Sequence, residues 1–107
     1  MDTDINNVFE GLLDCPQLKG FVKVVGIWEL ILKEQTIKIK VTYDYKTTYY
    51  SYAVSHYYQG PTDDKPNIPR KIIDDTSNGI LKRAVRIILS VYDTDYVGGK
   101  WVTNKEF

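Results

Sequence analysis

Apolar residues near the start of the chain recur with the spacing of a helix. Intervals of three and four place one stripe of side chains on a single helix face: Ile5, Val8, Phe9, Leu12 and Leu13. Thr3 is a suitable N-cap, and Pro16 should end the element because the residue before a proline disfavours helical backbone. The pattern predicts a short first helix.

Three runs of strand-like composition follow, over residues 21–33, 36–46 and 48–58. They are separated by short polar breaks at residues 34–35 and 46–47. Because such breaks are too short for crossover connections, the runs should form an antiparallel meander joined by two hairpins.

The positions of the two breaks predict a register. A turn centred on residues 34–35 places Leu32 opposite Ile37, Leu30 opposite Ile39, Trp28 opposite Val41 and Gly26 opposite Tyr43. A turn centred on residues 46–47 places Tyr43 opposite Tyr50, Val41 opposite Tyr52, Ile39 opposite Val54 and Ile37 opposite His56. Directly opposed side chains share a face, so one face of the sheet should be almost wholly apolar or aromatic.

A loop and a second helix complete the expected fold. Residues 59–69 hold three prolines and one glycine, which indicates irregular structure of a length that often carries function. Capping residues at 74–77 precede a strong amphipathic pattern, which predicts a helix over about residues 77–95 with Lys82, Arg83 and Arg86 on its outer side. Trp101 and Val102 should fold back on the core.

The predicted fold class is therefore α+β. We expect residues 1–107 to form one small domain with the order α-β-β-β-α. The long C-terminal helix should pack on the sheet face that carries Trp28, Ile39 and Val54. A length of 107 residues with 43% hydrophobic residues is sufficient for one core.

Charge and cysteine content limit the classes of partner and the cellular compartment that we expect. Fourteen basic and fourteen acidic residues give a formal net charge of zero, which argues against a broad nucleic-acid or membrane surface. Cys15 is the only cysteine, so no internal disulfide can form. With no signal-peptide pattern and no uninterrupted apolar span at the level of the sequence, we expect a cytoplasmic protein that does not enter a membrane.

The sequence offers no recognisable catalytic or metal-binding set. His56 is the only histidine, and its neighbour Ser55 should point to the opposite face of an extended strand, out of hydrogen-bond reach. One cysteine and one histidine cannot supply a standard zinc site, and the paired acids at 63–64, 74–75 and 93–95 lack the order of a calcium loop. We expect no metal, no cofactor and no enzymatic activity.

The leading functional hypothesis is a small binding or inhibitory protein that acts through a protein surface. Its size and its composition rich in Ile, Lys, Tyr and Asn are typical of microbial or phage accessory proteins of the anti-defence type. The outer sheet face keeps apolar and aromatic members, which favours contact with a partner or with a second copy through an exposed edge strand. The expected contact residues are His56, Tyr57, Tyr58, Gln59, Thr62, Asn67 and Arg70.

Two alternatives stay open. A small-ligand or nucleotide binder would use a pocket closed by the 59–69 loop and lined by Tyr50, Tyr52, His56 and Arg70, and would be marked by a deep cavity. A nucleic-acid-binding module would use Lys38, Lys40, Tyr49 and Tyr57 on the outer sheet face. Nucleic acid is the weaker candidate because acidic and aliphatic side chains share that face.

Overall fold

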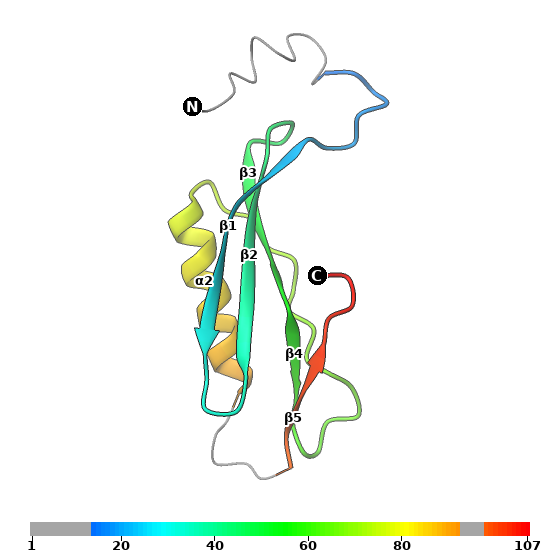
Figure 1. Ribbon diagram of the computed structural model, residues 1–107. Coiled ribbons are helices and arrows are strands. Elements are labelled where there is room, and N and C mark those ends of the chain that lie inside the picture. Colours follow the sequence, from blue (N-terminus) through cyan, green and yellow to red (C-terminus); the bar gives the residue numbers. More distant parts are fainter. Residues whose placement is uncertain (1–13, 93–97) are drawn as a thin grey trace.

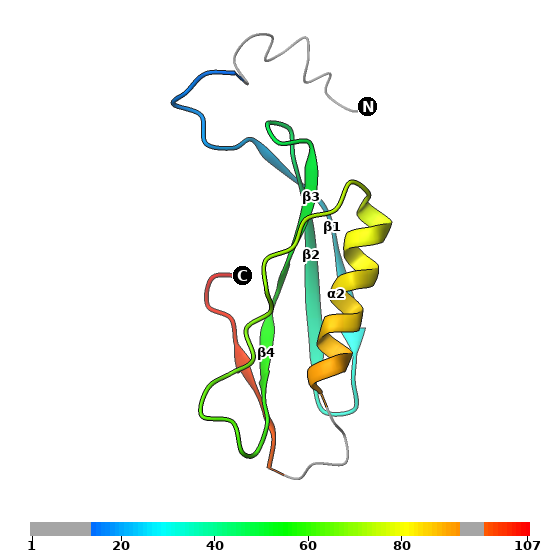
Figure 2. The same cartoon turned by 180° about the vertical axis from the view of Figure 1, so that it is seen from behind.

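The computed structural model describes residues 14–92 and 98–107, and it has an α+β architecture (Figures 1 and 2). The described elements, in order, are β1 (Val22–Ile31), β2 (Thr36–Asp44), β3 (Tyr49–Val54), β4 (His56–Gln59), α2 (Ser77–Val91) and β5 (Lys100–Thr103). The three-stranded antiparallel sheet and the long C-terminal helix are confirmed. The predicted first helix lies outside the described residues.

β1, β2 and β3 form a sheet in that order. The register between β2 and β3 is the predicted one, with Val41 opposite Tyr52 and Ile39 opposite Val54. The predicted register between β1 and β2 was wrong, because Trp28 lies opposite Ile39 and Leu30 opposite Ile37. The hairpin closes with a hydrogen bond from Leu32 N to Gln35 O (3.0 Å), so its centre is one residue earlier than expected. The pairing moves by two residues, which leaves residues 26–31 on their predicted faces. Beyond the register shift between Val24 and Gly26, however, Val22 and Val24 lie opposite Asp44 and Thr42, on the outer face and not on the face of Gly26 that regular alternation would give.

The third predicted strand does not run to residue 58. It breaks at Ser55, which stays attached to β2: the backbone N–H of Lys38 donates to Ser55 Oγ (2.8 Å), and Ser55 N–H donates to Lys38 O (2.9 Å). Beyond Ser55 the chain pairs with β5 instead, with His56 opposite Thr103 and Tyr58 opposite Trp101. The predicted pair of Ile37 and His56 is therefore wrong.

The helix α2 begins where its capping residues predict. Thr76 is the N-cap, and its hydroxyl accepts a hydrogen bond from Gly79 N–H (2.9 Å). One stripe of the helix packs against the apolar face of β2 and β3, and the buried core consists of Ile37, Ile39, Val41, Val54, Ile80, Ala84 and Ile88. Trp28 does not join this core, because the helix covers β2 and β3 and leaves Trp28 40% exposed.

The C-terminal segment folds back as predicted. Trp101 on β5 packs against the core. Asn104 Nδ2 donates to Val54 O (2.8 Å), and Asn104 N–H donates to Ser55 O (2.8 Å), so the segment is fixed to the point where β3 ends. Phe107 covers part of the outer sheet face, because Lys40 Nζ donates to Phe107 O (2.8 Å) and lies 4.6 Å from its ring centroid. Within the described ranges, no helix has both the length and the apolar character needed to span a bilayer.

Candidate functional site

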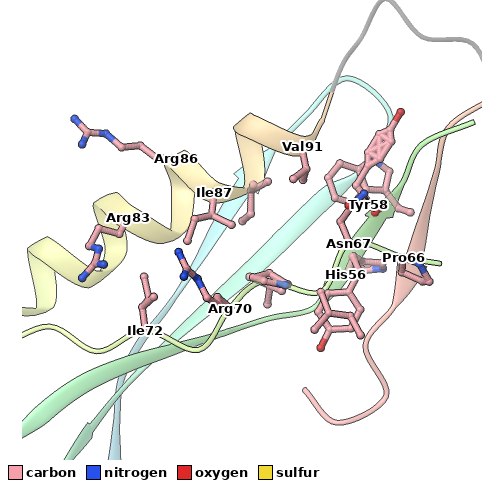
Figure 3. A pocket seen from close by; sticks show the side chains of 16 residues that line it. His56, Tyr58, Pro66, Asn67, Arg70, Ile72, Arg83, Arg86, Ile87 and Val91 are labelled. Atoms are coloured by element: carbon pink, nitrogen blue, oxygen red, sulfur yellow. Dashed lines mark hydrogen bonds between the residues drawn. The ribbon is translucent and has the colours of Figure 1, made fainter. Parts of the chain in front are cut away.

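A cleft of about 730 Å³ lies between the helix α2, the 66–72 segment and the β4–β5 ribbon (Figure 3). Its apolar and aromatic lining consists of Val54, Tyr57, Tyr58, Ile68, Ile72, Ile87, Ile88, Val91 and Trp101. Its polar lining consists of His56, Asn67, Arg70, Arg83 and Arg86, and two prolines, Pro66 and Pro69, complete it. No lining residue in the described part of the chain is an aspartate or a glutamate.

The 66–72 segment is held against β4 by Asn67. Its backbone N–H and its side-chain Nδ2 both donate to Tyr58 O, at 2.8 and 2.9 Å. Nδ2 also lies 3.1 Å from Asp63 Oδ2, which accepts from Gly60 N–H (2.9 Å). The loop is therefore closed by its own hydrogen bonds, and one wall of the cleft is preformed.

Aromatic rings build the end of the cleft near β5. Tyr58, Tyr92 and Trp101 contact one another with ring centroids 5.1–5.3 Å apart in tilted arrangements. Tyr58 is only 4% exposed, so this cluster is a rigid support. The cluster also joins the second sheet to the end of α2.

Three arginines give the cleft its charge. Arg83 is partly engaged, since its Nη1 donates to Ile73 O (3.1 Å) and lies 3.6 Å from Asp74 Oδ2. Arg70 and Arg86 are exposed, and within the described residues neither has a hydrogen bond or ion pair. Arg70 reaches from the 66–72 segment toward the helix, whereas the Arg86 side chain extends outward from α2 at the rim (Figure 3).

Ser55 and His56 are in contact, contrary to the sequence-based expectation. Ser55 Oγ lies 2.8 Å from His56 Nδ1, because the strand breaks at Ser55 and the two side chains no longer alternate across a regular strand. Ser55 is 8% exposed and its Oγ already accepts from Lys38 N–H. The Ser55 hydroxyl can donate to His56 Nδ1 in the tautomer that carries the ring proton on Nε2, and it accepts from Nδ1–H in the other tautomer. This contact orients the His56 ring, while the Ser55 hydroxyl is buried beneath it.

Tyr52 lines a smaller hollow of about 210 Å³ beside the cleft, and the two share the lining residues Tyr57 and Arg70 among others. The Tyr52 hydroxyl is buried, with no hydrogen-bond partner among the described residues. Burial raises the pKa of Tyr52, and nearby Tyr57 raises it further, while Arg83 opposes the change. A buried hydroxyl without a partner is a candidate contact for a bound polar group.

The structure brings together five of the seven expected contact residues: His56, Tyr57, Tyr58, Asn67 and Arg70. Gln59 and Thr62 lie outside the cleft lining. Gln59 Nε2 donates to Asp63 O (2.8 Å), and Thr62 is exposed on the loop. Tyr50, expected in a ligand pocket, is also absent from the lining.

Sequence reasoning missed the contribution of the helix. Arg83 and Arg86 were expected on its outer side but line the cleft, together with Ile87. Their spacing of three and four residues beside the buried stripe was a signal that these positions share one flank of α2. The sequence could not show that the 66–72 segment lies opposite that flank.

No group of three metal-ligating side chains occurs within residues 14–92 and 98–107. Comparisons with protein-family models, curated proteins and solved structures give no match.

Proposed function

We propose that the protein is a non-enzymatic binding protein whose cleft takes an acidic, partly apolar segment of a partner protein. The observation that supports this is the lining of the cleft: three arginines and a histidine lie among aliphatic and aromatic side chains, and among the described residues no acidic one joins them. A concentration of positive charge is notable in a chain with zero formal net charge. An inhibitory, phage-type accessory role would follow if the bound segment were needed for the partner's activity.

The chemistry of each wall suggests how such a segment would bind. Arg70 and Arg86 are available for carboxylates, and a guanidinium can bind a carboxylate through two parallel hydrogen bonds. Ile68 on one wall and Ile87 on the other provide apolar surface for a leucine or phenylalanine of the partner. Because the segment's charges meet arginines that lack partners within the described residues, binding does not require breaking an existing ion pair.

The experiment measures binding of two fluorescein-labelled peptides of equal length by fluorescence anisotropy. One peptide alternates Glu with Leu, and the other alternates Lys with Leu. We expect the acidic peptide to bind at least about tenfold more tightly than the basic one, because charge complementarity sets partner choice. The affinity for the acidic peptide should fall steeply as salt increases.

A matched pair of variants locates the site. Arg70→Glu should weaken binding of the acidic peptide by about tenfold or more, which corresponds to about 1.4 kcal/mol. Lys82→Glu makes the same charge change at an exposed position on α2 outside the cleft lining, and it should change affinity by less than about twofold. Equal affinity for both peptides, or equal losses in both variants, would contradict the proposal.

A small anionic ligand is the second candidate. The cleft volume of about 730 Å³ lies within the range of small-molecule sites, and Tyr52, whose buried hydroxyl has no partner among the described residues, lines the adjoining hollow. ATP and inorganic phosphate serve as probes in isothermal titration calorimetry. Binding of either one that is lost in Arg70→Glu, without binding of the acidic peptide, would favour this second function.

A further inference from the structure

β1 is an outer strand of its sheet, and within the described residues nothing pairs with its free side. It is ten residues long and carries six exposed large apolar side chains: Val22, Val24, Val25, Ile27, Trp28 and Ile31. Ile27 is 54% exposed and Ile31 is 76% exposed. A long apolar edge with free backbone groups is a template for pairing with another strand.

The ladder between β1 and β2 indicates which backbone groups are free. Hydrogen-bonded pairs occur at both of its ends, where Leu32 N–H donates to Gln35 O (3.0 Å) and Tyr45 N–H donates to Phe21 O (2.8 Å). Hydrogen-bonded and non-hydrogen-bonded positions alternate inward from these ends, with one residue skipped at the register shift between Val24 and Gly26. Five residues then direct their N–H and C=O away from β2: Val22, Val24, Ile27, Glu29 and Ile31.

These five positions are self-complementary. When two copies of β1 pair antiparallel with full overlap, Ile27 lies opposite its own copy, and the two-fold axis passes between the two residues. Val22 then faces Ile31 of the other copy, and Val24 faces Glu29. On the helix-covered side of the sheet, Trp28 falls opposite Gly26 of the other copy, over which that copy's own Trp28 ring lies, so the two indole rings meet near the axis.

Charge supports this register. Glu29 and its copy are four positions apart, which is about 13 Å at the rise of a strand, so like charges do not meet. Within its own chain Glu29 lies opposite Lys38, which reduces the cost of holding it at the new contact. A register centred on Glu29 would instead place the two carboxylates side by side.

We propose that the protein forms a symmetric dimer through β1, in which two three-stranded sheets join into one six-stranded sheet. The two-fold axis passes between Ile27 and its copy and is perpendicular to the sheet, so both α2 helices lie on the same face. β1 contributes no residue to the cleft, so each subunit keeps its cleft open. The dimer therefore presents two identical binding sites.

Sedimentation equilibrium of the full chain tests the dimer. We expect twice the chain mass of 12.4 kDa for the wild type. Ile27→Lys and Ile27→Glu should each sediment as a single chain, because each places two like charges on the axis. An equimolar mixture of the two variants should recover the double mass, since opposite charges then meet. Tyr49→Lys, at a position that is 43% exposed on β3, is the matched control and should remain dimeric.

A wild type that sediments as one chain at about 100 µM, well above a micromolar dissociation constant, overturns the proposal. The proposal is also overturned if Ile27→Lys still sediments with twice the chain mass. It is likewise overturned if the equimolar mixture of Ile27→Lys and Ile27→Glu sediments as single chains. If circular dichroism shows that the variants do not fold, amide exchange of the wild type decides: Ile27 and Glu29 should be protected when concentrated and should exchange faster on dilution. Unchanged exchange on dilution rejects the dimer. Binding of the acidic peptide by folded Ile27→Lys tests the cleft separately.

Discussion

Asn67 donates two hydrogen bonds to a single acceptor, the carbonyl oxygen of Tyr58, one from its backbone N–H and one from its side chain. Asn67→Ala removes the side-chain bond and the contact with Asp63 but retains the backbone bond. We expect the free energy of unfolding to fall by about 1 kcal/mol, as for loss of one partly exposed hydrogen bond. Urea unfolding measures this. Asp64→Ala, on the same loop, is the control and should have no comparable effect.

Gly99 lies against the ring of Tyr58. A Cβ at position 99 would overlap the Tyr58 hydroxyl and lie 2.8 Å from Cε2. Tyr58 cannot move aside because Tyr92 and Trp101 flank it. Gly99→Ala should therefore destabilise the protein by about 1–3 kcal/mol, the usual cost of overpacking.

The Tyr58→Phe background checks the cause of that loss in thermal unfolding. Removing the hydroxyl removes one of the overlapping atoms, so Gly99→Ala should cost less there than in the wild type. An equal cost in both backgrounds would mean that the loss arises from the backbone at position 99.

Asp74 should make stability depend on acid pH. Hydrogen bonding from the Thr76 backbone N–H (3.0 Å) holds the pKa of Asp74 below its ordinary value of 3.8. A carboxylate with a lowered folded-state pKa stabilises the fold above pH 3.8 and loses this contribution as pH falls through the folded-state value. The stability difference between wild type and Asp74→Asn should shrink below about pH 4, in chemical unfolding at a series of pH values. Parallel curves for the two proteins would contradict this account of the cap.

Ionisation of Tyr92 should make stability depend on alkaline pH. Its hydroxyl donates to the Glu34 carboxylate, and this bond, together with partial burial, raises the pKa of Tyr92 from 10.0 to about 12. Because the folded-state pKa is raised, the protonated tyrosine stabilises the fold below pH 10, and this contribution is lost as pH rises from 10 toward 12. In ultraviolet absorbance titration, the difference between wild type and Tyr92→Phe isolates this tyrosine. The same difference in a Glu34→Ala background should titrate closer to pH 10.

Local patterns were sufficient to predict the meander and the helix α2. The alternation in β2 and β3 and the capping residues before Ser77 depend on neighbours in the chain, and both were read correctly. The first hairpin was misplaced by one residue because residues 33–35 carry no turn signature such as Asn-Gly. The error did not change the faces of residues 26–31, because a shift of two in the pairing preserves the alternation, but the bulge between Val24 and Gly26 inverts residues 22–24 and has no signal in the sequence.

The break at Ser55 could not be read from the sequence, since no proline or glycine marks it. It depends on two distant partners, Lys38 on β2 and Asn104 near the end of the chain. The same difficulty applied to the cleft. His56 and Arg70 were chosen for their chemistry, but Arg83 could be added only once the position of the 66–72 segment was known.

The pairing of β4 with β5 also sets an order of assembly. The strands of the meander are joined by short hairpins. The partner of β4, in contrast, is β5, which follows α2 and is separated from β4 by almost half the length of the chain. Closing so long a loop lowers the chain entropy before the contacts between β4 and β5 can form. This ribbon should therefore form after α2 has packed on the three-stranded sheet. Since β4 and Trp101 line the cleft, a refolding molecule should gain its core first and its complete cleft last.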